Sequence, residues 1–152
     1  MNIHDRELTT FRTGGNAKDV GGMVMYDVTK RLEVYGYALK DPDSYLLTVC
    51  FEKVRGTIKN DCNVKDVPLG LRHVAADMTL GEFLLAKLTF APDDLSGFDL
   101  DTAVKQIQTG DTNTVFALGD GSLTPEQRLN RFTDYLLTAG RSEFAAYRRI
   151  RW

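Results

Sequence analysis

The sequence has few of the residues on which most catalytic and metal sites depend. Its 152 residues include only two histidines and two cysteines. There is no Cys-x-x-Cys pair and no cluster of histidines, so no stretch has the ligand spacing of a zinc site. No serine lies in a Gly-x-Ser-x-Gly turn, and the glycines fit neither a dinucleotide-binding nor a Walker A pattern. These absences predict a protein that is not an enzyme and that uses no cofactor or metal.

One pair of titratable residues offers an alternative to this prediction. His73 and Asp77 lie four positions apart in a segment predicted to be helical, so they would share one helix face and could act as an acid–base pair. We interpret them as a polar pair on the helix surface, because no nucleophile accompanies them in a recognisable pattern. Residues 93–101 contain several aspartates that could hold a cation loosely, although carboxylates in such a loop are usually solvated.

The chain also lacks long hydrophobic runs and a strong excess of charge. No apolar run approaches the ~18 residues that a membrane span needs, and residues 1–22 do not have the pattern of a signal peptide. The formal net charge of −2 argues against a surface devoted to nucleic acid. The length and the 43% of hydrophobic residues indicate one globular domain with a real core. Cys50 and Cys62 are expected to be reduced packing residues in a cytosolic setting.

The spacing of apolar residues predicts three helices in the first two thirds of the chain. Residues 1–22, which mix charges with glycine pairs, are predicted to form a flexible arm, and the first helix follows over residues 23–36. The second helix, residues 41–60, begins with Asp41 as N-cap and a proline after it, and it is half exposed. The third, residues 68–91, is apolar on two faces. It is therefore either the centre of the bundle or a subunit interface.

A different pattern precedes the last helix. Two short β-prone runs around a glycine-containing turn predict a β-hairpin at about residues 107–118. Thr124–Gln127 has the pattern of a capping box with proline at its first helical position, and the helix that it begins should end near Gly140. The predicted fold class is mainly α. A small helical bundle over residues 23–140 carries a β-hairpin insertion before its last helix.

Residues 141–152 have the composition of a partner-binding segment. They contain four arginines, Phe144, Tyr147 and the only tryptophan of the chain, Trp152. Arginine, tyrosine and tryptophan are enriched at the hot spots of interfaces, and guanidinium groups bind carboxylates or phosphates through a planar fork. This composition predicts a docking segment.

Two other interpretations of this segment remain open. It could be a last helix turn packed on its own core, with Phe144, Tyr147 and Ile150 inward and the arginines in solvent. It could also be a strand that adds to the sheet edge of a partner, because Arg148, Ile150 and Trp152 alternate with two arginines.

The order of these elements and several stretches of sequence resemble a known group, the head–tail connector (adaptor or head-completion) proteins of tailed bacteriophages and prophage elements. The resemblance runs from about Val28 to Trp152 and leaves out the arm. The stretches that carry it are IKNDCNV (58–64), VPLGL (67–71), ADMTLGEFLLAK (76–87), IQTGD (107–111) and FAAYRRIRW (144–152).

The resemblance implies a function in virus assembly. Connector subunits form a ring below the portal protein, and the genome passes through its channel without sequence-specific binding. It implies a homo-oligomeric ring, expected to be twelve-fold on the portal, which also contacts a downstream neck or tail protein (a stopper or tail terminator). The protein would be made in the bacterial host cytoplasm, would bind no membrane and would end at the head–tail junction of the virion. The portal-binding residues that it implies are Phe144, Tyr147, Arg148, Arg149, Ile150, Arg151 and Trp152.

A second function is compatible with the same arginines. A small nucleic-acid-binding protein could place them on phosphates. The acidic overall charge and the presence of a single basic cluster argue against this alternative.

Overall fold

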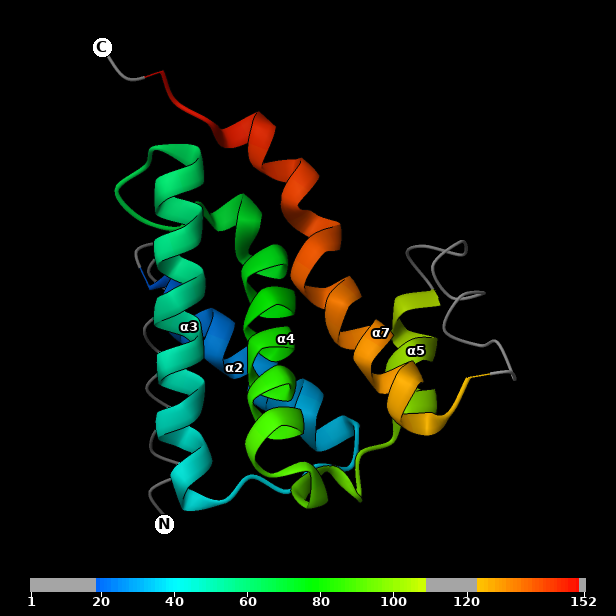
Figure 1. The fold of residues 1–152 in the computed structure, drawn as a ribbon. Coiled ribbons are helices and arrows are strands. Elements are labelled where there is room, and N and C mark those ends of the chain that lie inside the picture. The colour runs from blue at the N-terminus through cyan, green and yellow to red at the C-terminus, as the bar shows by residue number, and fades with distance from the viewer. Residues whose placement is uncertain (1–18, 109–122, 151–152) are drawn as a thin grey trace.

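The computed structural model describes residues 19–108 and 123–150, which form a bundle of helices (Figure 1). The α-helices are α2 (Val20–Val34), α3 (Asp41–Cys62), α4 (Arg72–Phe90), α5 (Leu100–Gln108) and α7 (Pro125–Thr138), and the 3-10 helices are η1 (Leu69–Leu71), η2 (Pro92–Leu95) and η3 (Ala139–Tyr147). The described ranges contain no strand. Within them, no helix combines the length and the apolar character needed to cross a membrane.

Helix α4 is the centre of the bundle. It lies between α3 and α7, and α2 crosses behind it (Figure 1). A Cβ atom on Gly81 would lie 3.0 Å from side-chain atoms of Leu136 and Leu137, so the absence of a side chain there lets α4 and α7 approach closely. The two apolar faces predicted for this helix are therefore explained by neighbours within the same subunit.

Helix α2 ends where the sequence predicts. Gly36 has a φ of 81°, a conformation that favours glycine. Its N–H donates to the carbonyl of Glu33 at 3.1 Å, and the N–H of Tyr37 donates to the carbonyl of Leu32 at 2.9 Å. This pair of hydrogen bonds is a Schellman motif, which satisfies carbonyl groups left open at the helix end.

The predicted starts of two later helices are confirmed to within one residue. Thr124 and Gln127 form the capping box: Thr124 Oγ1 accepts from the N–H of Gln127 at 3.1 Å, and Gln127 Oε1 accepts from the N–H of Thr124 at 3.0 Å. In α3, Asp41 is the first helical residue, and the N-cap is Lys40 instead. The N–H of Lys40 is satisfied by Asp43 Oδ2 at 3.0 Å.

The ends of two predicted segments differ from the structure. Helix α2 begins at Val20, inside the predicted arm, because Asp19 caps it through the N–H of Gly22 at 3.1 Å. The rest of the arm, residues 1–18, lies outside the described residues. The predicted hairpin at 107–118 is not supported, because residues 107–108 are the last two residues of α5, and residues 109–118 lie outside the described part.

The segment 93–101, predicted to be an acidic loop, contains most of η2 and the beginning of α5. Asp99 accepts a hydrogen bond from the N–H of Thr102 at 3.1 Å, as an N-cap residue does. This local cap precedes α5, and α5 continues to Gln108, into the start of the stretch that was predicted to be a β-hairpin. Asp94 and Asp101 are also engaged, in ion pairs with Lys87 and Arg128.

Cys50 and Cys62 are both free and buried, as predicted. Burial raises the pKa of the Cys50 thiol to about 11. The thiol is therefore protonated at neutral pH, which is the unreactive form.

A buried ion-pair network joins three segments at one end of the bundle. Lys87 of α4 is 8% exposed and Asp43 of α3 is 2% exposed. Lys87 Nζ lies 2.7 Å from Asp43 Oδ1 and 2.9 Å from Asp94 Oδ2 in η2. Tyr37 Oη donates to Asp43 Oδ2 at 2.7 Å. Each carboxylate oxygen of Asp43 thus has a partner.

These partners decide the protonation states within the network. Burial by itself raises the pKa of Asp43, but the hydrogen bonds from Lys87, from the Lys40 N–H and from Tyr37 more than offset it, so the pKa is lower than usual. Burial likewise lowers the pKa of Lys87, and the hydrogen bonds to Asp43 and Asp94 raise it above its ordinary value. Burial and the Asp43 carboxylate raise the pKa of Tyr37 to about 12.

Replacing Lys87 with methionine should destabilise the fold strongly. The substitution removes Lys87, the counter-ion that the described residues supply to the buried carboxylate of Asp43, so we expect the free energy of unfolding at neutral pH to fall by about 3 kcal/mol. Urea unfolding followed by circular dichroism measures this loss. The control is Lys53→Met, which breaks the pair of Lys53 with Glu82 on the surface and should cost less than ~1 kcal/mol.

The loss should depend on pH. In the wild-type protein the lowered pKa of Asp43 contributes stability that is present above the ordinary carboxyl pKa and is lost as the pH falls through the folded-state value. In Lys87→Met the buried carboxylate binds a proton more readily in the folded state. The difference between the two proteins should therefore shrink below about pH 4. A difference that is the same at pH 7 and pH 3 would contradict this account of the network.

Candidate partner-docking site

The C-terminal residues begin as a continuation of α7. Helix η3 follows α7 without a break and packs on the N-terminal half of α4 (Figure 1). A Cβ atom on Gly140 would lie 2.7 Å from Val74 Cγ1, so glycine allows this close approach. Phe144 is 1% exposed and belongs to the core. Of the predicted portal-binding residues, Phe144 thus has almost no surface to offer a partner.

Tyr147 lies over the turn that precedes α4. A Cβ atom on Gly70 would lie only 1.8 Å from the hydroxyl oxygen of Tyr147, so the ring occupies the space above this glycine. Tyr147 is half-buried against the core. For Phe144 and Tyr147, the structure matches the alternative in which these side chains point inward.

The chain then leaves the body in an extended conformation. Arg148 has a φ of −67° and a ψ of 134°. The N–H of Arg149 donates to the carbonyl of Cys62 at 2.8 Å, and Asn63 Nδ2 donates to the carbonyl of Arg149 at 3.2 Å. These two bonds hold Arg149 against the end of α3. Ile150 is 78% exposed, so the alternative in which it points inward is wrong.

We call residues 148–152 the terminal segment. Its described residues, Arg148 to Ile150, are all exposed, and Arg151 and Trp152 lie outside the described part of the chain. Arg149 also lines a hollow of about 600 Å³ with Lys59, Asn60, Asn63 and Val64. The structure therefore brings Lys59, a residue that the sequence analysis did not single out, to the same surface as Arg149.

The predicted pair of His73 and Asp77 is wrong, because each residue contacts a different partner. His73 Nε2 lies 3.0 Å from Glu143 Oε1 in η3, and Asp77 forms an ion pair with Arg31 of α2. A second ion pair joins α2 to α4, from Arg72 Nε to Asp27 Oδ2 at 2.8 Å. The two residues expected to form a polar pair on the surface of one helix therefore each contact another helix instead, because partners far away in sequence compete with the neighbour one turn along.

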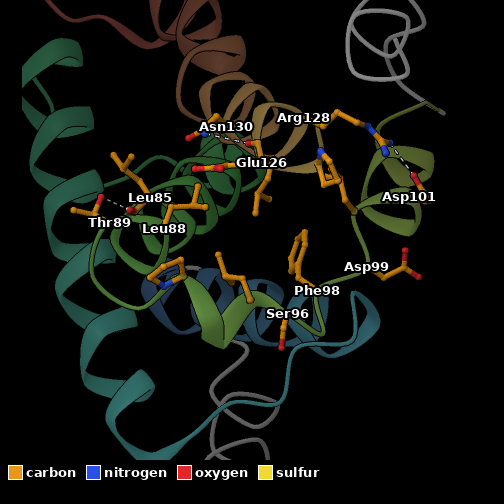
Figure 2. A pocket seen from close by; sticks show the side chains of 15 residues that line it. Leu85, Leu88, Thr89, Ser96, Phe98, Asp99, Asp101, Glu126, Arg128 and Asn130 are labelled. Carbon is orange, nitrogen blue, oxygen red and sulfur yellow. Dashed lines mark hydrogen bonds and ion pairs between the residues drawn. The ribbon is translucent and has the colours of Figure 1, made fainter. Parts of the chain in front are cut away.

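A groove that the sequence analysis missed lies at the other end of the bundle (Figure 2). It has a volume of about 800 Å³ and is formed by the C-terminal turns of α4, by η2 and by the first turns of α5 and α7. Its apolar lining includes Leu85, Leu88, Leu95, Phe98 and Leu129, and its acidic residues are Asp99, Asp101 and Glu126. We call it the acidic groove.

Charge in the acidic groove is not balanced. Among the lining residues in the part of the chain that the structure describes, Arg128 is the one basic side chain, and it pairs with Asp101 at 2.8 Å, as the dashed line in Figure 2 shows. The two hydrogen bonds from Thr102 hold the pKa of Asp99 below its usual range, so this carboxylate is ionised at neutral pH. No local sequence pattern reveals the groove, because its acids lie in two segments 25 or more residues apart along the chain.

Comparison of the chain with protein-family models, with curated proteins and with solved structures finds no match in any of the three. The resemblance to head–tail connectors thus gains no support from these comparisons and stays a prediction.

Replacing Gly70 with alanine should release the terminal segment. The added methyl group takes the position of the Tyr147 hydroxyl, so the ring must move and the anchor next to Arg148 is loosened. We expect trypsin to cleave after Arg148 and Arg149 roughly threefold faster or more, because local opening exposes the backbone, while the free energy of unfolding changes by less than ~1 kcal/mol. Mass spectrometry of timed digests measures the cleavage.

Gly56→Ala is the matched control. A Cβ atom on Gly56 has no atom within 4 Å, so alanine there should stabilise α3 by ~0.5–1 kcal/mol and leave cleavage after Arg148 unchanged. Equal cleavage rates in Gly70→Ala and the wild-type protein would show that the Tyr147 contact does not hold the terminal segment.

Proposed function

We propose that this chain is a structural subunit of the neck of a tailed bacteriophage. In this proposal copies of the chain form a ring that docks on the portal vertex and connects the DNA-filled head to the tail. The observation that carries the proposal is the terminal segment, which combines an anchored base with exposed cationic and apolar side chains at one end of the bundle. The resemblance of the sequence to connector proteins supplies the identity of the partner.

The anchoring of Arg149 suits a docking role. A peptide that is already ordered at its base loses less conformational entropy when it binds, so more of its contact energy appears as affinity. The backbone at Arg148 is extended, which is the conformation that a peptide needs to pair with the edge of a partner's sheet. The docking residues that we propose are therefore Arg148, Arg149 and Ile150 from the described part, followed by Arg151 and Trp152.

Exposed apolar side chains on the bundle support association between subunits. Tyr45 and Val49 lie one turn apart on α3 and are exposed, and Phe90 is exposed at the end of α4. Large apolar side chains in solvent stabilise an assembly when a neighbour covers them, each by roughly 1.5–3 kcal/mol on full burial. In the proposed ring, neighbouring subunits and the downstream neck or tail protein would supply that cover.

A second candidate function has one observation in its favour. The hollow beside Arg149 places the ammonium group of Lys59 and the amides of Asn60 and Asn63 at one surface, with Arg148 next in the chain. Such a group of donors can bind phosphate oxygens. A small nucleic-acid-binding protein could use this surface.

Removal of residues 148–152 should abolish docking and leave the fold intact. Of the residues removed, the described ones, Arg148 to Ile150, are exposed, and the two hydrogen bonds lost are each worth a net ~0.5–1.5 kcal/mol. Portal-containing heads from the phage that carries the chain, mixed with the truncated protein, should fail to acquire tails in electron micrographs. Circular dichroism should show an unchanged helix content.

Charge substitutions separate docking from a general loss of basic character. The double variant Arg148→Glu/Arg149→Glu should also fail to dock, whereas Arg131→Glu, an exposed site on α7, should dock normally. Normal tail attachment by the truncated chain would refute the proposed role of the terminal segment.

Titration with double-stranded DNA distinguishes the two candidate functions. In a connector the genome must slide past the ring, so we expect no retention of the isolated chain on DNA at moderate salt, measured by fluorescence anisotropy. Micromolar or tighter binding that falls steeply with salt, and that is lost in Lys59→Glu, would instead support the nucleic-acid-binding function.

A further inference from the structure

The terminal segment and the acidic groove have complementary chemistry. The segment contains three arginines, an isoleucine and a tryptophan within five residues. The groove has an apolar lining and carries the carboxylates of Asp99, Asp101 and Glu126, of which Asp101 pairs with Arg128. We infer that the acidic groove is the receptor for the terminal segment of a second copy of this chain.

The two sites of one subunit lie too far apart to meet. The terminal segment leaves the body beside Gly70 and Cys62, before the first residue of α4, whereas the groove lies along the last turns of α4. Helix α4 has 19 residues, which corresponds to about 28 Å. Figure 1 shows the same separation, with η3 at one end of the bundle and η2 at the other.

The reach of the terminal segment is shorter than this distance. Arg149 is held at the end of α3 by its two hydrogen bonds, so only residues 150–152 can extend from that point. At about 3.3 Å per residue they span roughly 10 Å. The groove must therefore receive the segment from another molecule.

Charge sets the direction of this contact. At their own end of the bundle the arginines lie near both Lys59, which lines the adjacent hollow, and Asp61, so the charge there is mixed. At the groove they meet Asp99, whose ionised form is stabilised by Thr102, and Glu126. A guanidinium group binds a carboxylate through two parallel hydrogen bonds, and Ile150 and Trp152 are the residues suited to the apolar lining. One contact of this kind is head-to-tail, since the two surfaces differ.

This inference goes beyond the proposed function. The portal contact uses the terminal segment alone, whereas the contact between copies uses the segment and the groove. A head-to-tail contact closes into a ring when its rotation permits closure and otherwise extends into a filament. One terminal segment cannot occupy a groove and a portal at once, so binding to the portal would release the groove of the neighbouring copy.

Charge reversal in the full-length chain tests the contact. We expect the wild-type chain to self-associate in a concentration-dependent way in sedimentation velocity, and we expect Glu126→Lys to raise the dissociation constant roughly tenfold. Asp134→Lys makes the same charge change on the exposed side of α7, outside the groove, and should associate like the wild-type protein. Arg148→Glu/Arg149→Glu should associate as weakly as Glu126→Lys.

Rescue and cross-linking identify the occupant. Mixing Glu126→Lys with Arg148→Glu/Arg149→Glu should restore association, because the intact segment of the first variant meets the intact groove of the second, and the reversed segment meets the reversed groove. In a separate mixture, Ile150→Cys on one copy and Ser96→Cys in the groove of another should form a disulfide-linked dimer under mild oxidation. The combination of Ile150→Cys with Thr48→Cys, which is exposed on α3, should give little product.

Three results would overturn the inference. They are a wild-type chain that stays monomeric at all concentrations, equal association of Glu126→Lys and Asp134→Lys, and cross-linking that does not distinguish Ser96→Cys from Thr48→Cys. If removal of residues 1–18 abolishes association while the charge reversals have no effect, the arm is the occupant and the inference is wrong. Glu126→Lys keeps an intact terminal segment, so its docking on portal-containing heads reports on the proposed function independently.

Discussion

Three segments of the chain meet at the ammonium group of Lys87, and one end of the bundle depends on the balance of charge there. Asp43 of α3 and Asp94 of η2 both contact it, and Tyr37 satisfies the second oxygen of Asp43. A buried ion without its partner costs several kcal/mol, so packings of α3, α4 and η2 that separate these groups are strongly disfavoured. Because η2 leads directly into Phe98 and α5, the same network positions the lining of the acidic groove.

The parts of the fold that the sequence predicts are those with local causes. The Schellman end at Gly36 and the capping box at Thr124 depend on residues within one helix turn, and both are confirmed. Lys87 could not be identified as a buried cation in this way, because Asp43 is 44 residues away in the chain (87 minus 43). Helix α5 was missed for a different reason. The β-prone residues near its end predicted a hairpin, whereas the hydrogen bond by which Asp99 caps the helix at Thr102 involves only a few residues and gives a weak sequence pattern.

The candidate site shows the same limit. The composition of the segment and the resemblance to connectors together place Phe144, Tyr147 and Ile150 in one docking group, yet the structure divides them. Phe144 is buried in the core, Tyr147 fills the space above Gly70, and Ile150 remains in solvent. A helix end that packs on its own core and a peptide that binds a partner have similar compositions, since both need aromatic and cationic residues. Only the tertiary contacts show where the packed helix end stops and the exposed terminal segment begins.

That division has a consequence for assembly. The residues that anchor the terminal segment belong to the stable core, so the free part is short, and a short segment can reach only a partner that approaches the same end of the bundle. A subunit built in this way has two different surfaces, the arginine-containing terminal segment and the acidic groove, about one α4 length apart. Copies in solution would pair the terminal segment of one with the acidic groove of another. A portal that offers carboxylates to the terminal segments competes with the grooves for the same arginines. In the proposed neck, a weaker groove contact would therefore favour docking of the segments on the portal over association of free copies.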